Sequence, residues 1–444
     1  MAGARPSVEQ SSPTKVTVAA SIGSFIVWYD YFVATTAAVI VWPAIFFPKE
    51  PGIALILSLT TILATKASAP IGSAIFGHYG DRLGRRGGMT WTLLITGLAS
   101  LGVALTPGYA ALGILSAVLI FALRIAAGIG KGGEYGQSVT WVSEAAHGSK
   151  WRGFWGSWVG SAVQLGTIAS SLSFSIIAAA LPSAAFLQWG WRLLFVIGSL
   201  AALVGIVIRL RAAESPLFLN LKERGGLAKS PVTEVARKDW RTILLLLIPF
   251  GALFGVGNLV GVVGGQAFLK ALHVPLPVIT LSVAAAATVA LFAGIGFAVL
   301  SDMFPRGRKW ILIAVMILVA AGSTIAFRLY ELKSTWGVVL GMISVFGLSS
   351  STSQIFPSLL TDQFGTRTRT SGSGLISEFG ALLSGLYTSP LLPIIISIYG
   401  GSIVAASYGL TMVAIPSMAI GIVFLLVLKE KRPTDLSSET EYPA

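Results

Sequence analysis

The sequence predicts an all-α polytopic membrane protein with twelve transmembrane helices in two six-helix halves. Of its 444 residues, 54% are hydrophobic and only 11% are charged, whereas about a quarter of residues are charged in soluble domains. Apolar runs of about 20 residues, long enough to cross a bilayer, recur from end to end. Two charged loops of the first half also recur in the second half, at almost the same distance along the sequence. What remains leaves no room for a large soluble domain.

The first half of the chain contains six apolar runs, each bounded by charged residues, proline or glycine. A polar stretch, residues 1–15, precedes them and is expected on the cytoplasmic side. The predicted spans cover residues 16–42, 52–77, 87–106, 109–136, 153–181 and 189–210. Together they form an N-terminal half over residues 16–210.

The second half of the chain has the same organisation. Its predicted spans cover residues 241–270, 277–301, 309–328, 335–361, 370–397 and 399–428. They form a C-terminal half over residues 241–428, followed by a cytoplasmic tail, residues 429–444. The one long connector, residues 211–240, is basic and is broken by Gly225-Gly226 and Ser230-Pro231. We expect this connector to be a solvated cytoplasmic linker.

The formal net charge of +13 is explained by topology. When both termini and the even-numbered loops are assigned to one side, that side collects most of the 31 lysines and arginines. By the positive-inside rule this side is cytoplasmic, so both termini are expected in the cytoplasm of a cell whose plasma membrane the chain crosses. The basic balance therefore predicts contact with a lipid bilayer and no nucleic-acid partner.

Several chemistries have no motif in this chain. Without cysteine there are no disulfides, thiolate metal sites or cysteine nucleophiles. There is no Gly-x-x-x-x-Gly-Lys-Ser/Thr loop for ATP and no Gly-x-Ser-x-Gly, and the three histidines lie far apart in the sequence. We expect no enzymatic activity, no metal and no cofactor.

An internal duplication supports the two halves. The segment Gly77–Arg86 joins spans two and three, and Leu300–Lys309 joins spans eight and nine, each with an aspartate followed by basic residues. A second charged pair, Glu144 with Arg152, recurs as Asp362 with Arg369 at almost the same spacing. Many transporters consist of such repeats, with the binding site at mid-membrane between them.

These loops predict a cytoplasmic gate. An aspartate at a helix end that faces arginines and the N-terminus of a neighbouring helix makes a latch that opening must break. The alternative is that the charges only set topology. The predicted gate residues are Asp81, Arg82, Arg85, Arg86, Glu144, Arg152, Glu214, Asp302, Arg306, Arg308, Asp362 and Arg369.

The first of these loops reads Gly-x-x-x-Asp-Arg-x-Gly-Arg-Arg, and four further stretches are distinctive. They are Trp28-Tyr29-Asp30-Tyr31-Phe32, Gly132-Gly133-Glu134, Gly190-Trp191-Arg192 and Glu214-Ser215-Pro216-Leu217-Phe218. On these residues the chain resembles the major facilitator superfamily and, across nearly its whole length, the metabolite:H+ symporter family. The resemblance implies proton-driven uptake of carboxylates or of zwitterions such as proline and betaine.

Two positions depart from that family. Relatives have arginine before the proline of span two, where this chain reads Ala69-Pro70, but Lys66 lies one helical turn earlier. Lys131 occupies a position that is usually apolar in relatives. Both lysines are candidates to bind an anionic substrate group, with snorkelling of the ammonium toward water as the alternative.

A charge at mid-bilayer costs at least about 2.5 kcal/mol, so each charged residue within a span needs a partner or a wet cavity. Asp30 in span one and Arg124 in span four lie at similar depth and are predicted to be the proton carrier and its switch, because similar residues form a coupling pair in proton-driven relatives. The alternative is a structural salt bridge. Glu134 could relay protons or simply neutralise Lys131 one turn away.

Other residues complete the predicted substrate site. Glu378, the acidic residue within a span of the second half, is either a gate residue or a substrate-side acid. The predicted substrate-binding set is Tyr29, Tyr31, Lys66, Lys131, Gln164, Asn258 and Glu378. For the tyrosines and amides the alternative is an interhelical hydrogen bond or an interfacial anchor.

The function predicted from all of this is secondary active transport. The chain would couple inward proton flow to uptake of a small, anionic organic metabolite by alternating access, and would work as a monomer with the proton as coupling ion. Two alternatives stay open within transport, namely a zwitterionic osmolyte and a sugar. A third, from a different class, is a membrane sensor that moves no solute.

Overall fold

The computed structural model describes residues 13–47, 51–83, 85–146, 149–210, 231–304, 307–364 and 369–431. Within these ranges every regular element is a helix. Twelve helices are long and apolar enough to cross a membrane. The predicted all-α, twelve-span fold is therefore confirmed.

The N-terminal half consists of six spans and short accessory helices. The elements are α1 (Pro13–Ile40), α2 (Trp42–Ile45), α3 (Pro51–Leu83), α4 (Arg85–Leu105), α5 (Tyr109–Leu112), α6 (Ile114–Ala145), α7 (Arg152–Ala180), α8 (Ser183–Ala185), the π-helical segment η1 (Phe186–Gly190) and α9 (Trp191–Leu210).

The C-terminal half also has six spans, several of which change helix type along their length. The elements are α11 (Pro231–Lys238), α12 (Trp240–Val256), η2 (Gly257–Val262), α13 (Val263–Ala271), α14 (Leu276–Met303), α15 (Arg308–Glu331), α16 (Thr335–Met342), η3 (Ile343–Gly347), α17 (Leu348–Ser350), η4 (Ser351–Gln354), α18 (Phe356–Gln363), α19 (Arg369–Leu386), η5 (Tyr387–Leu391), α20 (Leu392–Ile398) and α21 (Ile403–Val427).

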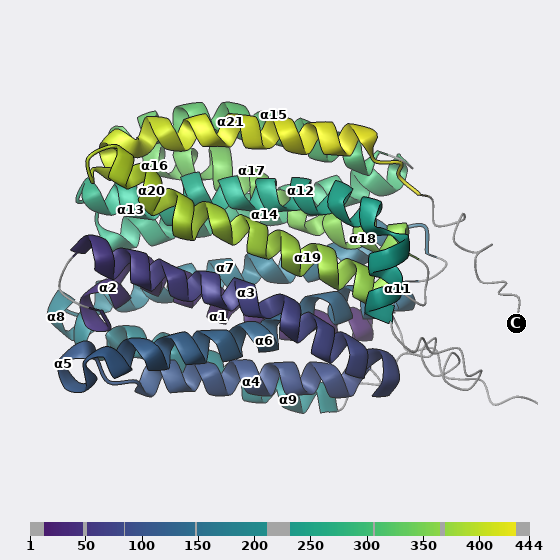
Figure 1. Cartoon of the computed structure of the whole chain (residues 1–444), viewed down its shortest axis with the longest axis horizontal. Helices are drawn as coiled ribbons and strands as arrows, with labels where there is room; N and C mark the ends of the chain where they lie inside the picture. Colours follow the sequence, from purple (N-terminus) through teal and green to yellow (C-terminus); the bar gives the residue numbers. More distant parts are fainter. Residues whose placement is uncertain are drawn as a thin grey trace, which may run out of the picture.

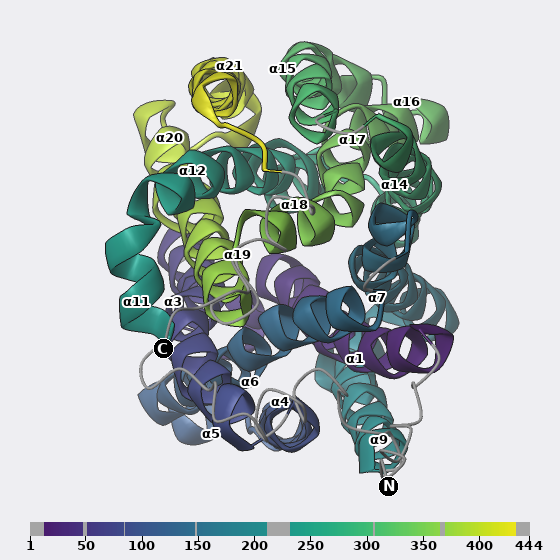
Figure 2. The ribbon, with the colours of Figure 1, turned by 90° about the vertical axis from the view of Figure 1, so that its right-hand side faces the viewer.

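The two halves lie side by side with their helices roughly parallel to one long direction (Figure 1). In this view the purple-to-blue helices of the N-terminal half are below and the green-to-yellow helices of the C-terminal half are above. The view along the bundle shows α7 beside α14 and α3 beside α19, so these pairs form much of the contact between halves (Figure 2). We call the end where α1 begins and α21 ends the terminal end.

Three predicted boundaries differ from the structure. Span four, predicted over 109–136, is helical over Ile114–Ala145, because Gly113 with φ +56° separates it from α5 and because its polar C-terminal third is buried. Span ten, predicted as one helix over 335–361, is interrupted by η3 and η4. Within the predicted connector, residues 231–238 form α11, and residues 211–230 lie outside the described residues.

Glycines allow the closest helix contacts in the N-terminal half. A Cβ atom at Gly132 of α6 would overlap the carbonyl oxygen of Ala69 in α3, and one at Gly72 of α3 would overlap the carbonyl oxygen of Ile129 in α6. The two backbones therefore touch. Small residues permit this approach, which dispersion forces then stabilise in a bilayer. It brings Lys66 of α3 and Lys131 of α6 to neighbouring faces of the same half.

Candidate functional site

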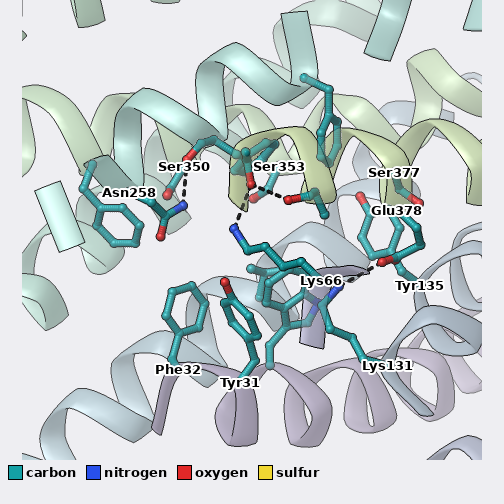
Figure 3. Close-up of a pocket in the computed structure, with 17 residues that line it drawn as sticks. Tyr31, Phe32, Lys66, Lys131, Tyr135, Asn258, Ser350, Ser353, Ser377 and Glu378 are labelled. Carbon is teal, nitrogen blue, oxygen red and sulfur yellow. Dashed lines mark hydrogen bonds and ion pairs between the residues drawn. The ribbon is translucent and has the colours of Figure 1, made fainter. Parts of the chain in front are cut away.

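A pocket lies between the two halves near the middle of the bundle (Figure 3). The free space within it is only about 50 Å³, so its walls nearly close on each other. Seven of its lining residues are aromatic: Trp28, Tyr31, Phe32, Tyr135, Phe250, Phe254 and Phe346. Three are charged, Lys66, Lys131 and Glu378. Besides the two tyrosines, five carry a hydroxyl or amide: Asn258, Ser350, Ser353, Ser377 and Ser384.

An ion pair crosses this pocket. Lys131 Nζ of α6 lies 3.1 Å from Glu378 Oε2 of α19, which joins the N-terminal half to the C-terminal half. Lys131 is only 4% exposed, and its ammonium lies 4.8 Å from the centre of the Trp28 ring. The expectations that Lys131 snorkels or is neutralised by Glu134 are wrong, because α6 continues beyond this residue and turns Lys131 toward the pocket.

Lys66 supplies a second ammonium to the pocket from α3. Its Nζ donates a hydrogen bond to Ser384 Oγ of α19 at 2.8 Å and lies 5.8 Å from the centre of the Tyr31 ring. Lys66 is 4% exposed, so it does not snorkel. A cation thus lies in the pocket although the arginine expected before Pro70 is missing.

Asp30 and Arg124 form the predicted pair within the N-terminal half. Arg124 Nη1 of α6 lies 3.1 Å from Asp30 Oδ2 of α1, and Arg124 is fully buried. Asp30 Oδ1 and Arg124 Nη2 have no hydrogen-bond partner within the described part of the chain. The pair does not line the pocket, but Asp30 directly precedes Tyr31, which does.

Glu134 belongs to a different buried cluster. Arg209, near the end of α9, binds both Glu134 carboxylate oxygens, and Thr92 and Ser138 each donate a hydrogen bond to it at 3.0 Å. The alternative that Glu134 serves Lys131 is therefore wrong. Arg209 is 1% exposed although it lies one residue before the end of the predicted sixth span. The cluster ties α4, α6 and α9 together.

Two of the predicted substrate-binding residues lie away from the pocket wall. The Tyr29 hydroxyl donates to the Leu194 carbonyl at 3.2 Å, inside the N-terminal half. Gln164 of α7 donates to the Ser350 carbonyl at 3.0 Å and to Ser353 Oγ at 2.9 Å. Both fit the alternative of an interhelical hydrogen bond, and that of Gln164 joins the two halves. Tyr31, Lys66, Lys131, Asn258 and Glu378 do line the pocket.

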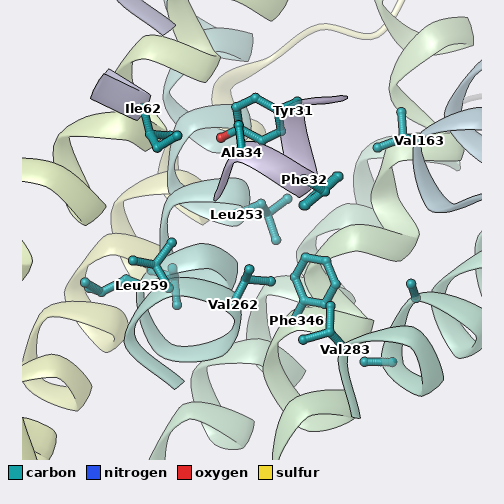
Figure 4. Close-up of a cluster of buried hydrophobic side chains, with 14 of the residues drawn as sticks. Tyr31, Phe32, Ala34, Ile62, Val163, Leu253, Leu259, Val262, Val283 and Phe346 are labelled. Atoms are coloured by element: carbon teal, nitrogen blue, oxygen red, sulfur yellow. The ribbon is translucent and has the colours of Figure 1, made fainter. Parts of the chain in front are cut away.

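The aromatic wall was missed by the sequence reasoning. Phe32 of α1 and Phe346 of η3 meet across the halves with ring centres 6.3 Å apart, and Figure 4 shows both in the buried hydrophobic cluster. Phe250 and Phe254 lie one turn apart on α12 with ring centres at 4.6 Å. Spacing of four residues was visible in the sequence, but aromatic residues at this spacing also occur throughout apolar helices.

A latch joins the halves at the terminal end. Asp302 at the end of α14 accepts hydrogen bonds from the backbone N–H groups of Gly153 and Phe154, at 2.8 and 2.9 Å, in the first turn of α7. Arg308 lies 3.5 Å from the same carboxylate. A carboxylate at a helix N-terminus is stabilised by the helix dipole and by the free N–H groups. This is the arrangement predicted for the gate.

The second repeated charge pair reinforces this latch. Asp362 of α18 forms ion pairs with Arg308 and, at 3.1 Å, with Arg152 of α7. Arg369 donates to the Thr361 carbonyl at 3.0 Å within its own half, and Glu144 is buried. The remaining predicted gate residues cannot be placed: Glu214, Arg306 and the side chains of Asp81, Arg82, Arg85 and Arg86 lie outside the described part of the chain.

A vestibule of about 730 Å³ lies between the halves at the opposite end of the bundle. It is lined by residues of α1, α2, α3, α13 and the α20–α21 segment. Lys270 lines it and donates a hydrogen bond to the Ile40 carbonyl at the end of α1, at 3.1 Å. The arrangement places a small pocket with charged side chains at mid-bundle, between the latch at one end and the vestibule at the other.

Known proteins are similar to this chain in sequence and in fold. A family model described as "Sugar (and other) transporter" matches residues 16–245. The inner membrane metabolite transport protein YhjE of Escherichia coli (strain K12) is 29% identical over 423 residues, which cover 91% of this chain and 94% of that protein. The proline/betaine transporter of Salmonella typhimurium is 29% identical over 246 residues, covering 53% of this chain and 49% of that protein.

Solved structures agree. A proton:xylose symporter, XylE, bound to 6-bromo-6-deoxy-D-glucose superposes with a TM-score of 0.69 at 19% identity, covering 97% of this chain and 99% of that chain. A partially occluded, inward-open conformation of XylE from E. coli superposes with a TM-score of 0.71 at 18% identity, covering 94% and 98%. At these identities the likeness shows the fold alone.

Proposed function

The chain belongs to the sugar (and other) transporter family of the major facilitator superfamily, and from this membership we propose that it is a proton-coupled symporter of a small organic carboxylate. The family consists of transporters, not enzymes. The single observation that carries the choice of an anion is the pair of ammonium groups in the pocket, Lys66 and Lys131, opposed by one carboxylate. Buried charge of one sign favours a ligand of the other.

Proton coupling is assigned to Asp30 and Arg124. Arg124 is the counter-charge of the Asp30 carboxylate at 3.1 Å. A movement that separates the two residues would leave the Asp30 carboxylate without its counter-charge, and in this proposal the transported proton then replaces Arg124 as its partner. Because Asp30 and Tyr31 are adjacent on α1, a rotation of this helix changes the pocket wall and the ion pair together. That link couples substrate binding to protonation.

Transport proceeds by alternating access in this proposal. The latch joins the halves at the terminal end, and the vestibule separates them at the other end. We assign the terminal end to the cytoplasm, since the basic loops predicted to be cytoplasmic lie there, and the bilayer to the plasma membrane. Both termini are then cytoplasmic. One chain encloses the whole pocket, so a monomer suffices, with the proton as the coupling ion.

Uptake into proteoliposomes tests the proposal. The purified protein is reconstituted, an inside-alkaline gradient is imposed, and accumulation of labelled mono-, di- and tricarboxylates is followed with and without a protonophore. Accumulation that the protonophore abolishes is expected for at least one carboxylate. If the gradient drives none of them inward, proton-coupled carboxylate uptake is refuted.

A zwitterionic substrate is the second candidate. It is favoured by the match to a proline/betaine transporter and by the Trp28 ring, whose face already holds an ammonium at 4.8 Å. Competition separates the candidates: unlabelled betaine, proline, xylose and carboxylates are added against whichever labelled solute accumulates. Displacement by betaine and not by carboxylates would replace the first candidate with the second.

A further inference from the structure

The charges in the pocket do not balance. Among its lining residues only Lys66, Lys131 and Glu378 are charged. Lys131 and Glu378 neutralise each other at 3.1 Å. Lys66 has the neutral hydroxyl of Ser384 as its hydrogen-bond partner and forms no ion pair with any residue of the described part of the chain. The pocket thus carries one uncompensated positive charge.

Three of the polar side chains beside this charge already donate within their own helices. The hydroxyls of Ser377 and Ser384 donate to carbonyls of their own helix, Gly374 at 3.0 Å and Ala381 at 2.8 Å, and thus turn only lone pairs toward the pocket. The amide nitrogen of Asn258 donates to the Phe254 carbonyl at 2.7 Å. Besides the ammonium groups, a ligand meets only neutral donors, such as the Tyr135 hydroxyl and the Trp28 indole N–H, and these cannot neutralise a second carboxylate.

Much of the rest of the wall is aromatic. Trp28 and Phe32 face it from α1, Phe250 and Phe254 from α12, and Phe346 from η3. Rings prefer to contact other rings at their faces and edges, which favours a planar apolar ligand over a branched or polar one.

Building on the proposed carboxylate transport, we propose that the substrate is a monocarboxylate with a planar apolar body, such as an aromatic acid, and that Glu378 excludes dicarboxylates. One carboxylate brings the pocket to neutrality with Lys66, Lys131 and Glu378. A dicarboxylate would leave a net negative charge at mid-membrane, which is costly. Glu378 also occupies Lys131, the cation that a second carboxylate would need.

Equilibrium binding to the full-length purified protein tests this inference. Benzoate and phthalate share one ring and differ by one carboxylate, and their dissociation constants are measured by calorimetry or thermal shift. The wild type is expected to bind benzoate at least tenfold more tightly than phthalate. Glu378→Gln frees Lys131 and is expected to reverse this preference. Lys66→Met is expected to weaken benzoate binding at least tenfold.

A double variant provides the matched control. Lys131→Met with Glu378→Gln removes the ion pair but leaves the net charge of the pocket at one positive, so it is expected to keep the preference for benzoate. The inference is overturned if the wild type binds phthalate as tightly as benzoate, if Glu378→Gln leaves the ratio unchanged, or if the double variant prefers phthalate as Glu378→Gln does.

The binding and uptake experiments test the inference and the proposed function separately. These constants are measured without a proton gradient, so benzoate-selective binding without gradient-driven uptake supports this inference and refutes proton coupling. Gradient-driven uptake of succinate or phthalate with no binding of benzoate supports the proposed function and overturns this inference.

Discussion

At the scale of single residues, several buried basic side chains in the described spans meet acidic partners on other helices, whereas Lys66 meets a serine hydroxyl. Arg124 meets Asp30, and Lys131 meets Glu378. The first pair was predictable because both residues lie at one depth of the membrane. The partner of Glu134 was not, because Arg209 stands at the end of a span, where a basic residue usually reports topology. The depth of a residue in the membrane can be estimated from its position in a span, whereas the rotation of the helix about its axis cannot.

Asp30→Asn tests the proton carrier. Asparagine keeps the shape of the side chain but cannot exchange a proton, so gradient-driven accumulation is expected to fall to background while substrate exchange across the membrane persists and no longer depends on pH. Both are measured in proteoliposomes with the same labelled solute.

Asp239→Asn, just outside the spans, is the control and is expected to transport like the wild type. Active accumulation by Asp30→Asn would remove Asp30 from the proton pathway.

Glu134→Gln tests the buried cluster. The substitution leaves the Arg209 guanidinium without its counter-charge, and loss of one partner from a buried pair costs about 3–5 kcal/mol of unfolding free energy. A lower midpoint of thermal unfolding in detergent is expected. The exposed pair of Arg328 and Glu331 offers the comparison, since Glu331→Gln is expected to cost less than about 1 kcal/mol. Equal shifts of the unfolding midpoint in the two variants would show that the buried pair contributes no more to stability than the exposed pair.

At the scale of elements, small residues decide where helices touch. Glycine at position 132 lets α6 lie directly on α3, and glycine at 160 lets α7 lie against η4 of the other half. The sequence shows that the chain is rich in glycine, with 50 of 444 residues. Which of them mark a contact depends on the helix face, and only the packed structure shows that face.

Gly132→Ala is expected to destabilise the protein. The added methyl group would overlap the Ala69 carbonyl oxygen, a backbone atom that cannot move alone, and overpacking of this kind costs about 1–3 kcal/mol. Gly296→Ala in α14 is the matched control, because no atom lies within 4 Å of the added Cβ. Thermal unfolding should separate the two variants; a common midpoint would contradict close contact between α3 and α6.

At the scale of the whole molecule, contacts at two depths hold the halves together. The terminal end is held by charges, with Asp302 on the N-terminus of α7 and Asp362 between Arg152 and Arg308. The middle is held by Lys131 with Glu378 and by aromatic rings. Opening toward the terminal end must break both groups of contacts. Each group therefore contributes to the equilibrium between the conformation open at the terminal end and the one open at the opposite end.

Asp302→Asn is expected to loosen the terminal end. Asparagine presents one donor where two backbone N–H groups need acceptors, and loss of about 1 kcal/mol of latch energy shifts a two-state balance about fivefold. The chain has no cysteine, so a single Ser358→Cys, buried near Gly156 of α7, reports opening by its rate of maleimide labelling.

The labelling rate is expected to rise severalfold when Asp302→Asn is added to Ser358→Cys. Ser407→Cys on α21, buried within the C-terminal half, is the control and should label at an unchanged rate. If Asp302→Asn leaves the labelling rate of Ser358→Cys unchanged, the latch does not hold the terminal end closed and its charges only set topology.

The sequence by itself determined the twelve spans, the duplication and the few charges placed inside the membrane. These features depend on the hydropathy of about 20 consecutive residues and on the cost of charge in lipid, both of which are local. The tertiary structure alone decided that Lys131 meets Glu378, that Arg209 meets Glu134, and that Asn258 lines the pocket while Gln164 does not. The physical reason is helix rotation: one residue turns a side chain by about 100°, so partners far apart in the chain are chosen by packing and not by composition.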